Sequence, residues 1–366
     1  MEPDPLHDSS SPDTQMKIWL ARAVNMEASD LHLIPGYRPV VRLHGNLVEL
    51  DEAILDDRAI LDLIATYCPA GLAERYRVER NADFSFEIPV NGHVNRFRTN
   101  LFFADEHPAA CLRIVPSVIP DFAWANFPTP LAERVIGLQD GLVILTGITG
   151  SGKTTSLAMI VDQFNQMGGR RIITVEEPVE YRYPQAGNSV VTQREVGSDV
   201  RSFAEGLRSG LRQDPDVILV GEVRDRETAQ IVLSAAETGH LVFTSLHTRD
   251  TKGAISRFAD LFPQDVQSDI RSQLAIGLRA IICQRLLPDL LPGKKRHLAL
   301  EVLWNSIPIA SCIRQGKLET IDNYLMTRRD EGMVSFDESI RKLLVAGKIS
   351  YQVAEQNVRD PSILKR

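Results

Sequence analysis

The sequence has few cysteines, and none of them lies close to another. Its 366 residues include four cysteines, and no two of them form a CxxC pair. This spacing excludes a cysteine-based zinc site and a disulfide framework. Each cysteine is expected to be a small buried apolar side chain, and a reducing cytoplasm is the simplest setting for them. The four are Cys68, Cys111, Cys283 and Cys312.

The sequence also lacks an excess of positive charge and a long apolar run. Its 41 Lys and Arg residues against 48 Asp and Glu residues give a net charge of −7. That balance argues against a nucleic-acid partner. No run approaches the roughly 20 apolar residues that span a bilayer, so a role at a membrane is expected to come through partners. Residues 1–14 are rich in Asp, Ser and Pro, and are expected to be a disordered tail and not a signal peptide.

The pattern of apolar residues predicts an α/β protein of two domains. Residues 15–115 combine helical segments with alternating strands, which predicts an α+β domain with an antiparallel sheet. Residues 116–130 contain four prolines and are expected to form a linker and hinge. In residues 131–290 short apolar runs alternate with helical segments, which predicts a mainly parallel sheet covered on both faces. After about residue 254 the pattern is mostly helical, and residues 291–366 are expected to be a helical C-terminal region.

A glycine-rich loop follows the predicted strand at residues 141–146. The segment GITGSGKT, residues 147–154, fits the pattern G-x-x-x-x-G-K-[ST], and a predicted helix follows it. In such a loop backbone N–H groups and the helix N-terminus bind phosphate oxygens. Lys153 is expected to reach the β- and γ-phosphates of ATP, and Thr154 to hold Mg²⁺. The predicted nucleotide-binding residues are Gly147, Thr149, Gly150, Ser151, Gly152, Lys153, Thr154 and Thr155.

Carboxylates follow two further predicted strands. Glu222 ends the run DVILVGE, and residues past the C-terminal ends of parallel strands line the ligand crevice. Glu222 is therefore a candidate to deprotonate the attacking water and to contact Mg²⁺ through water, a surface carboxylate being the alternative. Glu176 and Glu177 end the run RIITVEE. Because neighbours on a strand point opposite ways, one of them is expected at the site, and Glu177 is favoured over a solvated pair.

Histidines flank another predicted strand, and arginines occur on the N-terminal sheet. His240 and His247 flank the run LVFTSL, and His247 is expected at the same sheet edge as the loop, sensing the γ-phosphate or a neighbouring subunit. Arg96 and Arg98 share one strand face, and Arg113 follows on a later strand. These arginines form either a solvated face or an arginine finger that neutralises phosphates across an interface.

Two aromatic residues of the predicted linker, Trp124 and Phe127, have two possible roles. They can stack on the adenine ring or pack in the domain core. Core packing is the commoner role of large aromatic side chains and is favoured here.

Four segments in one order resemble the secretion ATPases of the type II secretion and type IV pilus superfamily. They are GITGSGKTT, ITVEEPVEY, LRQDPDVILVGEVRDRET and AAETGHLVFTSLHT, and the resemblance extends from about residue 28 to about residue 349. It implies an N-terminal PAS-like domain, a RecA-like ATPase domain and a ring-shaped homo-hexamer that hydrolyses ATP. It also implies a cytoplasmic protein, peripheral to the inner membrane through a platform protein of a pilus or secretion machine.

The resemblance also assigns roles to matching residues. Lys153 and Thr154 match the Walker A residues, and Glu222 matches the Walker B glutamate. Glu176 and Glu177 match the acidic box, and His240 and His247 match the His box. Three further residues match the arginines that close the site: Arg96, Arg98 and Arg113.

Within the superfamily, the PilT-like branch of pilus-retraction motors is expected. Extension and secretion motors usually carry a long N-terminal region and a four-cysteine zinc loop, and this sequence shows neither. Two features depart from the PilT-like pattern. The acidic box reads Glu-Glu in place of Glu-Asp, and the AIRNLIRE-like retraction motif is matched at residues 308–315 only by Ile309, Ile313 and Arg314. An accessory paralogue or an ATPase of a type II or type IV secretion system is therefore the alternative, and a nucleic-acid translocase a more distant one.

Overall fold

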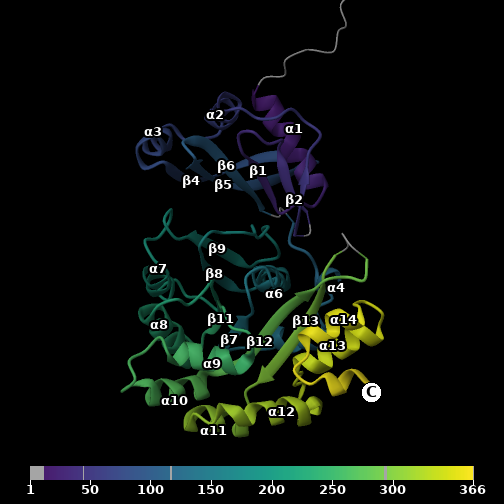
Figure 1. Cartoon of the computed structure of the whole chain (residues 1–366). Helices are drawn as coiled ribbons and strands as arrows, with labels where there is room; N and C mark the ends of the chain where they lie inside the picture. Colours follow the sequence, from purple (N-terminus) through teal and green to yellow (C-terminus); the bar gives the residue numbers. More distant parts are fainter. Residues whose placement is uncertain (1–11, 44, 116–117, 292–294, 366) are drawn as a thin grey trace, which may run out of the picture. The chain divides into compact units, whose positions relative to one another are not determined.

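The computed structural model describes residues 12–43, 45–115, 118–291 and 295–365. The chain divides into two units, Met1–Val118 and Ile119–Arg366 (Figure 1). Each unit has its own sheet and its own hydrophobic core. Within the described ranges, no helix is both long enough and apolar enough to cross a membrane.

The N-terminal unit is built on a six-stranded antiparallel sheet in the order β3-β2-β1-β6-β5-β4, as the alternating pattern predicted. Helix α1 covers the core with Met16, Trp19, Leu20 and Ala23, which are buried at the spacing of one helical face. The elements are α1 (Pro12–Asn25), β1 (Asp30–Leu33), β2 (Val40–Leu43), β3 (Asn46–Glu49), α2 (Asp57–Ala65), α3 (Ala70–Glu79), β4 (Asn81–Val90), β5 (His93–Ala104) and β6 (His107–Val115).

Two details of this unit follow from local chemistry. Asn91 and Gly92 both have positive φ, 55° and 80°, and close the two-residue hairpin between β4 and β5, as Asn-Gly pairs commonly do. The predicted C-terminal boundary of the tail, residue 14, is wrong, because α1 already begins at Pro12. Proline fits the first turn of a helix, where its missing N–H costs no hydrogen bond. Residues 1–11 lie outside the described residues.

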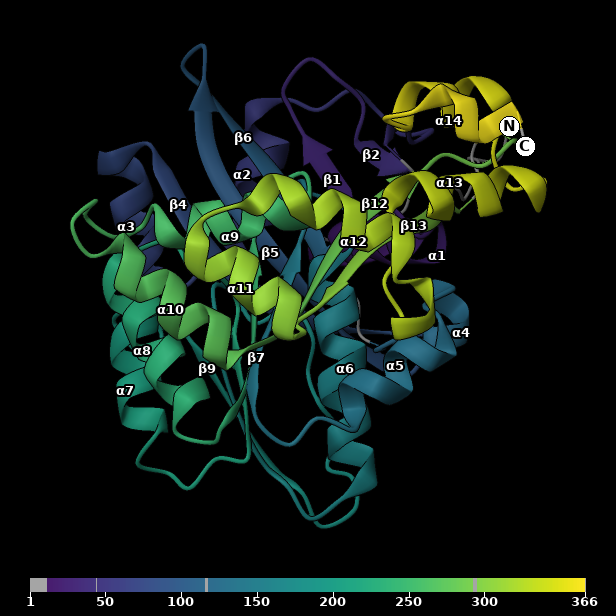
Figure 2. The same ribbon diagram turned by 90° about the horizontal axis from the view of Figure 1, so that it is seen from below.

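The C-terminal unit is built on a seven-stranded sheet in the order β13-β12-β7-β11-β10-β8-β9, parallel except between β12 and β13. Figure 2 shows α7, α8 and α10 on one side of this sheet and α4, α5 and α6 on the other. Every residue of β7, β10 and β11 is buried, which explains their continuous apolar runs.

The helices and strands of the C-terminal unit have the following bounds: α4 (Phe122–Ala125), α5 (Thr129–Ile136), β7 (Gly141–Thr146), α6 (Lys153–Met167), β8 (Arg171–Glu176), β9 (Val190–Glu195), α7 (Phe203–Gly210), β10 (Val217–Val220), α8 (Arg226–Glu237), β11 (Leu241–Leu246), α9 (Thr251–Ala259), α10 (Gln267–Gly277), β12 (Leu278–Leu287), β13 (His297–Trp304), α11 (Ile307–Gln315), α12 (Ile321–Thr327), α13 (Phe336–Val345) and α14 (Tyr351–Asn357). Short 3₁₀ turns span Leu318–Thr320, Arg329–Glu331 and Pro361–Lys365.

Two sequence-based expectations for this unit need correction. The segment at residues 116–130 is not plain linker, because it contains α4, capped by Asp121, and the start of α5. Residues beyond 254 are mostly helical, as predicted, but the prediction missed β12 and β13, which form an antiparallel ribbon at one end of the sheet. Short apolar runs such as those of β12 and β13 have no clear period, so the pattern cannot separate a buried strand from a buried helix.

Candidate nucleotide site

The glycine-rich loop lies where predicted, between β7 and α6, and residues 148–150 at its tip are exposed. Gly147 has a φ of 145°, and a Cβ there would come within 2.5 Å of both the Gln284 carbonyl oxygen and Ser151 Oγ. No other residue fits that position. Gly152, with a φ of 88°, caps α6, so the free N–H groups of the first turn of α6 point into the loop. A loop of this form, closed by a helix N-terminus, suits a bound phosphate.

Lys153 is the charged group inside the loop. Its Nζ donates hydrogen bonds to the carbonyl oxygens of Gly147 at 2.9 Å and Ile148 at 3.2 Å. The side chain is buried, and this burial lowers the pKa of its ammonium group, although the charge of Glu222 opposes the shift. The loop thus holds the ammonium in place while Gly150 and Thr149 remain exposed at the tip.

The other predicted loop residues have different surroundings. Thr154 lies in the first turn of α6 with its side chain half-buried. Thr155 Oγ1 is 3.0 Å from the hydroxyl of Tyr181, and Ser151 is buried. In the described part of the chain, no three His, Cys, Asp or Glu side chains gather into a metal-binding group. The half-buried Thr154 offers a hydroxyl oxygen, the kind of ligand that Mg²⁺ prefers, so this residue fits the ion that the sequence predicts.

Glu222 and His247 meet at the C-terminal edge of the sheet, beside Lys153. His247 Nε2 is 3.3 Å from a carboxylate oxygen of Glu222, and His247 Nδ1 is 3.5 Å from Lys153 Nζ. Since the ammonium can only donate, Nδ1 is the acceptor and Nε2 carries the proton toward Glu222. Burial and the nearby charge of Lys153 lower the pKa of His247, which keeps the ring neutral. The two residues therefore lie together at the predicted edge.

Arg224 joins both carboxylates of this edge, and sequence reasoning gave it no role. It forms an ion pair with Glu222 and donates a hydrogen bond of 3.0 Å from Nη1 to Glu177. Glu177 therefore belongs to the same cluster as Glu222. The available signal was the position of Arg224, two residues after Glu222, since residues two apart in an extended segment share one side.

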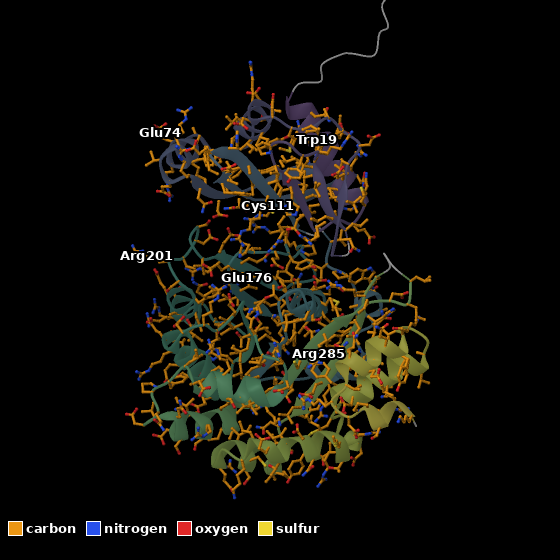
Figure 3. The ribbon with its side chains drawn as sticks, viewed as in Figure 1. Trp19, Glu74, Cys111, Glu176, Arg201 and Arg285 are labelled. Atoms are coloured by element: carbon orange, nitrogen blue, oxygen red, sulfur yellow. The ribbon has the colours of Figure 1, made fainter. Side chains whose placement is uncertain are left out.

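Glu176 points elsewhere, so the two acids separate as expected for neighbours on a strand. Its side chain is 5% exposed and accepts hydrogen bonds from Thr174 Oγ1 at 2.6 Å and Gln193 Nε2 at 3.3 Å. Burial raises the pKa of its carboxyl to about 7, although both hydrogen bonds oppose that shift. Figure 3 labels this residue within the C-terminal unit.

The structure does not bring His240 to this cluster. It precedes β11, and its Nδ1 lies 3.2 Å from both Thr238 Oγ1 and the Ala235 carbonyl oxygen. The glycine-rich loop follows the opposite end of β7, which runs parallel to β11. The length of a six-residue strand, roughly 20 Å, therefore separates His240 from the glycine-rich loop. Within one chain His240 lies at the far edge of the sheet from the loop, and its role in the site stays a prediction.

The three predicted arginines lie in the N-terminal unit. Arg98 on β5 pairs directly with Arg113 on the neighbouring strand β6. Arg96 lies two residues before Arg98, on the same half-buried face of β5. Arg113 Nε donates to Asp30 at 3.2 Å. Their approach to a nucleotide remains a prediction.

The two linker aromatics have separate roles. Phe127 is 3% exposed and packs in the core of the C-terminal unit, as favoured. Trp124 is 54% exposed, with Lys295 Nζ 3.6 Å from the centre of its ring. Core packing is therefore confirmed for Phe127 and is wrong for Trp124.

The parallel sheet, the glycine-rich loop with its lysine and the carboxylate beyond β10 define a P-loop ATPase. Residues 13–359 match the family model described as "Type II/IV secretion system protein". The type IV pilus retraction ATPase PilT of Pseudomonas aeruginosa is 35% identical over 342 residues, which cover 93% of this chain and 97% of that protein. The chain belongs to the type II/IV secretion system protein family.

Two further comparisons agree with this assignment. The type IV pilus ATPase PilU of Pseudomonas aeruginosa is 33% identical over 331 residues, covering 90% of this chain and 85% of that protein. A crystal structure of the pilus retraction motor PilT with bound ADP aligns with a TM-score of 0.83 and 38% identity, covering 96% of this chain and 98% of that one.

Proposed function

We propose that this chain hydrolyses ATP to power retraction of a type IV pilus. The observation that carries the proposal is the contact of Glu222 with His247, beside the loop lysine Lys153. The similarity to PilT over nearly the whole chain supports the choice of pilus retraction within the family. In this account the chain is cytoplasmic, works as a homo-hexamer and acts on a platform protein of the inner membrane, with no nucleic-acid partner.

The proposed mechanism uses residues of the described cluster. The loop amides and Lys153 hold the phosphates of ATP, with Thr154 as the ligand of Mg²⁺. Mg²⁺ supplies positive charge that neutralises phosphate oxygens. Glu222 accepts a proton from the attacking water, while neutral His247 orients its carboxylate. Arg96, Arg98 and Arg113 supply positive charge to the phosphates from the N-terminal unit of the same or a neighbouring chain. Opening and closing between the units then moves the ring.

An accessory motor, or an ATPase of a secretion system, is the second candidate. The observation that favours it concerns helix α11, whose residues 308–315 match the retraction motif only weakly. Ile309 and Ile313, two of the three matches, are fully buried, so packing in the core explains them. Arg314 is the exposed match. The similarity to PilU fits an accessory motor equally.

A strain that lacks this gene distinguishes these functions. Retraction predicts excess surface pili and lost twitching in that strain, corrected by the wild-type gene and not by Glu222→Gln. Normal pili and motility would contradict a retraction role. Secretion should then be measured in the same strain, since lost protein export would establish the second candidate.

A further inference from the structure

The segment after β11 is attached to the base of the glycine-rich loop. The backbone N–H of Thr248 donates to Thr146 Oγ1 at 3.0 Å, and Thr146 is the last residue of β7 before Gly147. Thr248 Oγ1 donates in turn to the carbonyl oxygen of Asp250 at 2.9 Å. The segment 247–250 therefore sets the place of His247 relative to Lys153.

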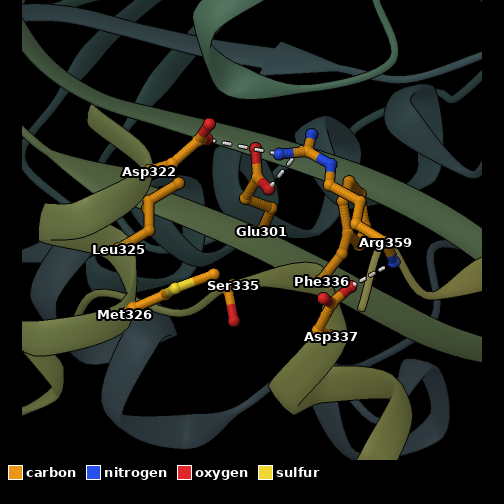
Figure 4. Close-up of a pocket in the computed structure, with 8 residues that line it drawn as sticks. All are labelled: Glu301, Asp322, Leu325, Met326, Ser335, Phe336, Asp337 and Arg359. Atoms are coloured by element: carbon orange, nitrogen blue, oxygen red, sulfur yellow. Dashed lines mark hydrogen bonds and ion pairs between the residues drawn. The ribbon is translucent and has the colours of Figure 1, made fainter. Parts of the chain in front are cut away.

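Arg359 holds the other end of this segment. It follows α14, and its guanidinium reaches the carboxylates of Asp250 at 2.9 Å, Asp322 at 3.3 Å and Glu301 at 3.7 Å. Its backbone N–H donates to Asp337 Oδ1, on the first turn of α13, at 2.8 Å. Figure 4 shows the guanidinium with dashed contacts to Asp322 and Glu301, and the apolar side chains of Leu325 and Met326 on the other side of the pocket. The guanidinium thus joins the N-terminal cap of α9 with β13 and α12, and the backbone N–H of Arg359 adds α13.

The carboxylates around Arg359 need its charge. Glu301 is 1% exposed and accepts hydrogen bonds from both the backbone N–H and the hydroxyl of Thr251, each at 2.9 Å. Burial raises the pKa of Glu301, which those hydrogen bonds and Arg359 oppose. Removal of the guanidinium would leave Asp250 and the buried Glu301 without their shared cation, while Asp322 would keep Lys252 Nζ at 2.6 Å. A buried charge without a partner is strongly destabilising. The N-terminus of α9, where Asp250 and Thr251 lie, would therefore shift.

A second side chain joins the same two parts of the chain. Arg285 on β12, labelled in Figure 3, donates to the carbonyl oxygens of Arg249 at 3.3 Å and of Asn357 at 3.2 Å. Residues 357 and 359 are thus bound to residues 249 and 250 through two independent guanidinium groups. The position of the C-terminal helices and the position of the segment beside the nucleotide loop cannot change independently.

We propose that Arg359 is a positioning residue for ATP hydrolysis, which fixes the segment 247–250 and so couples turnover at Glu222 to the C-terminal helices α12, α13 and α14. The inference rests on the proposed ATPase activity. It assigns to the C-terminal region a direct influence on hydrolysis. Arg359 itself touches neither substrate nor the reacting atoms, and acts through Asp250 and its neighbours.

The test is a double-mutant cycle on the purified full-length chain. Arg359→Gln removes the guanidinium charge. Asp250→Asn removes one carboxylate and keeps the Oδ1 that accepts from Gly253 N and caps α9. We expect each substitution to lower kcat about tenfold with little change in KM, and the double variant to resemble the single ones. Arg341→Gln is the matched control, because it breaks a two-bond pair with Glu338 on α13 and should leave kcat unchanged.

Nucleotide-binding stoichiometry separates positioning from misfolding. If Arg359→Gln does not bind nucleotide, Asp250→Asn alone decides the question. A kcat of Asp250→Asn within about threefold of wild type, or additive losses in the double variant, would overturn the inference. A wild-type chain without ATPase activity would instead overturn the proposed function, so the two failures are distinct.

Discussion

His247 Nε2 lies 3.3 Å from the carboxylate of Glu222, on the side of the ring away from Lys153. A neutral imidazole in this place accepts from the lysine at Nδ1 and donates to the carboxylate at Nε2. The orientation of Glu222 therefore depends on the protonation state of one histidine. A protonated ring would lose its acceptor and face the lysine with a second positive charge.

Turnover should consequently fall in acid as His247 becomes protonated. Because burial and Lys153 lower the pKa of this histidine from 6.5, activity should persist at about pH 6.5 and be lost below it. His247→Gln, which keeps a neutral donor and acceptor but does not titrate, should show a flatter profile of kcat at pH values below about 6.5. Measuring kcat against pH for both proteins tests this. An identical acid limb in the two would refute the role of His247.

Arg224 should act together with Glu177. Because it contacts both Glu222 and Glu177, Arg224→Gln is expected to lower kcat about tenfold, a loss of roughly 1.4 kcal/mol in the transition state. Glu177→Gln should cost less in a chain that already lacks the arginine than in wild type. Steady-state kinetics of the wild type, the two single variants and the double variant give the coupling energy between Arg224 and Glu177. Independent effects would mean that the pair is a surface contact without influence on Glu222.

Glu176 should make the protein less stable as pH rises. Its folded-state pKa of about 7 exceeds the ordinary 4.5, so the folded chain binds more protons than the unfolded chain between these values. The contribution of Glu176 to the free energy of unfolding is therefore fully present below pH 4.5. It falls by about 3 kcal/mol as the pH rises through 7. Glu176→Gln keeps an acceptor for Thr174 and Gln193 and does not titrate. Its gain over wild type in denaturant unfolding should be larger at about pH 8 than at about pH 5. An equal gain at both would contradict the burial argument.

Much of the site could be predicted because it depends on short local patterns. The strand, glycine loop and helix around Lys153 are consecutive in sequence, and Glu222 and His247 each follow a buried strand. The contact of Arg224 with two carboxylates depends on the crossing of separate segments, which no local pattern contains. The same holds for Glu176, whose partner Gln193 lies on the missed edge strand β9.

The errors also have physical causes. His240 was grouped with His247 because the family resemblance assigns both to the His box, yet the two residues flank one strand, whose ends lie at opposite edges of the sheet. The strands β12 and β13 are buried along almost their whole length, so no alternation separated them from helices. Pro12 and Pro130 occupy first turns of helices rather than interrupting them.

The central claim is that Glu222 is the base of an ATP-hydrolysing site. The most direct measurement is turnover and nucleotide binding of the purified wild-type chain beside Glu222→Gln, which preserves the size of the side chain. The account predicts steady ATP hydrolysis by the wild type, and a loss of at least about 100-fold in kcat with ATP binding retained in the variant. Near-normal turnover by Glu222→Gln would contradict the assignment.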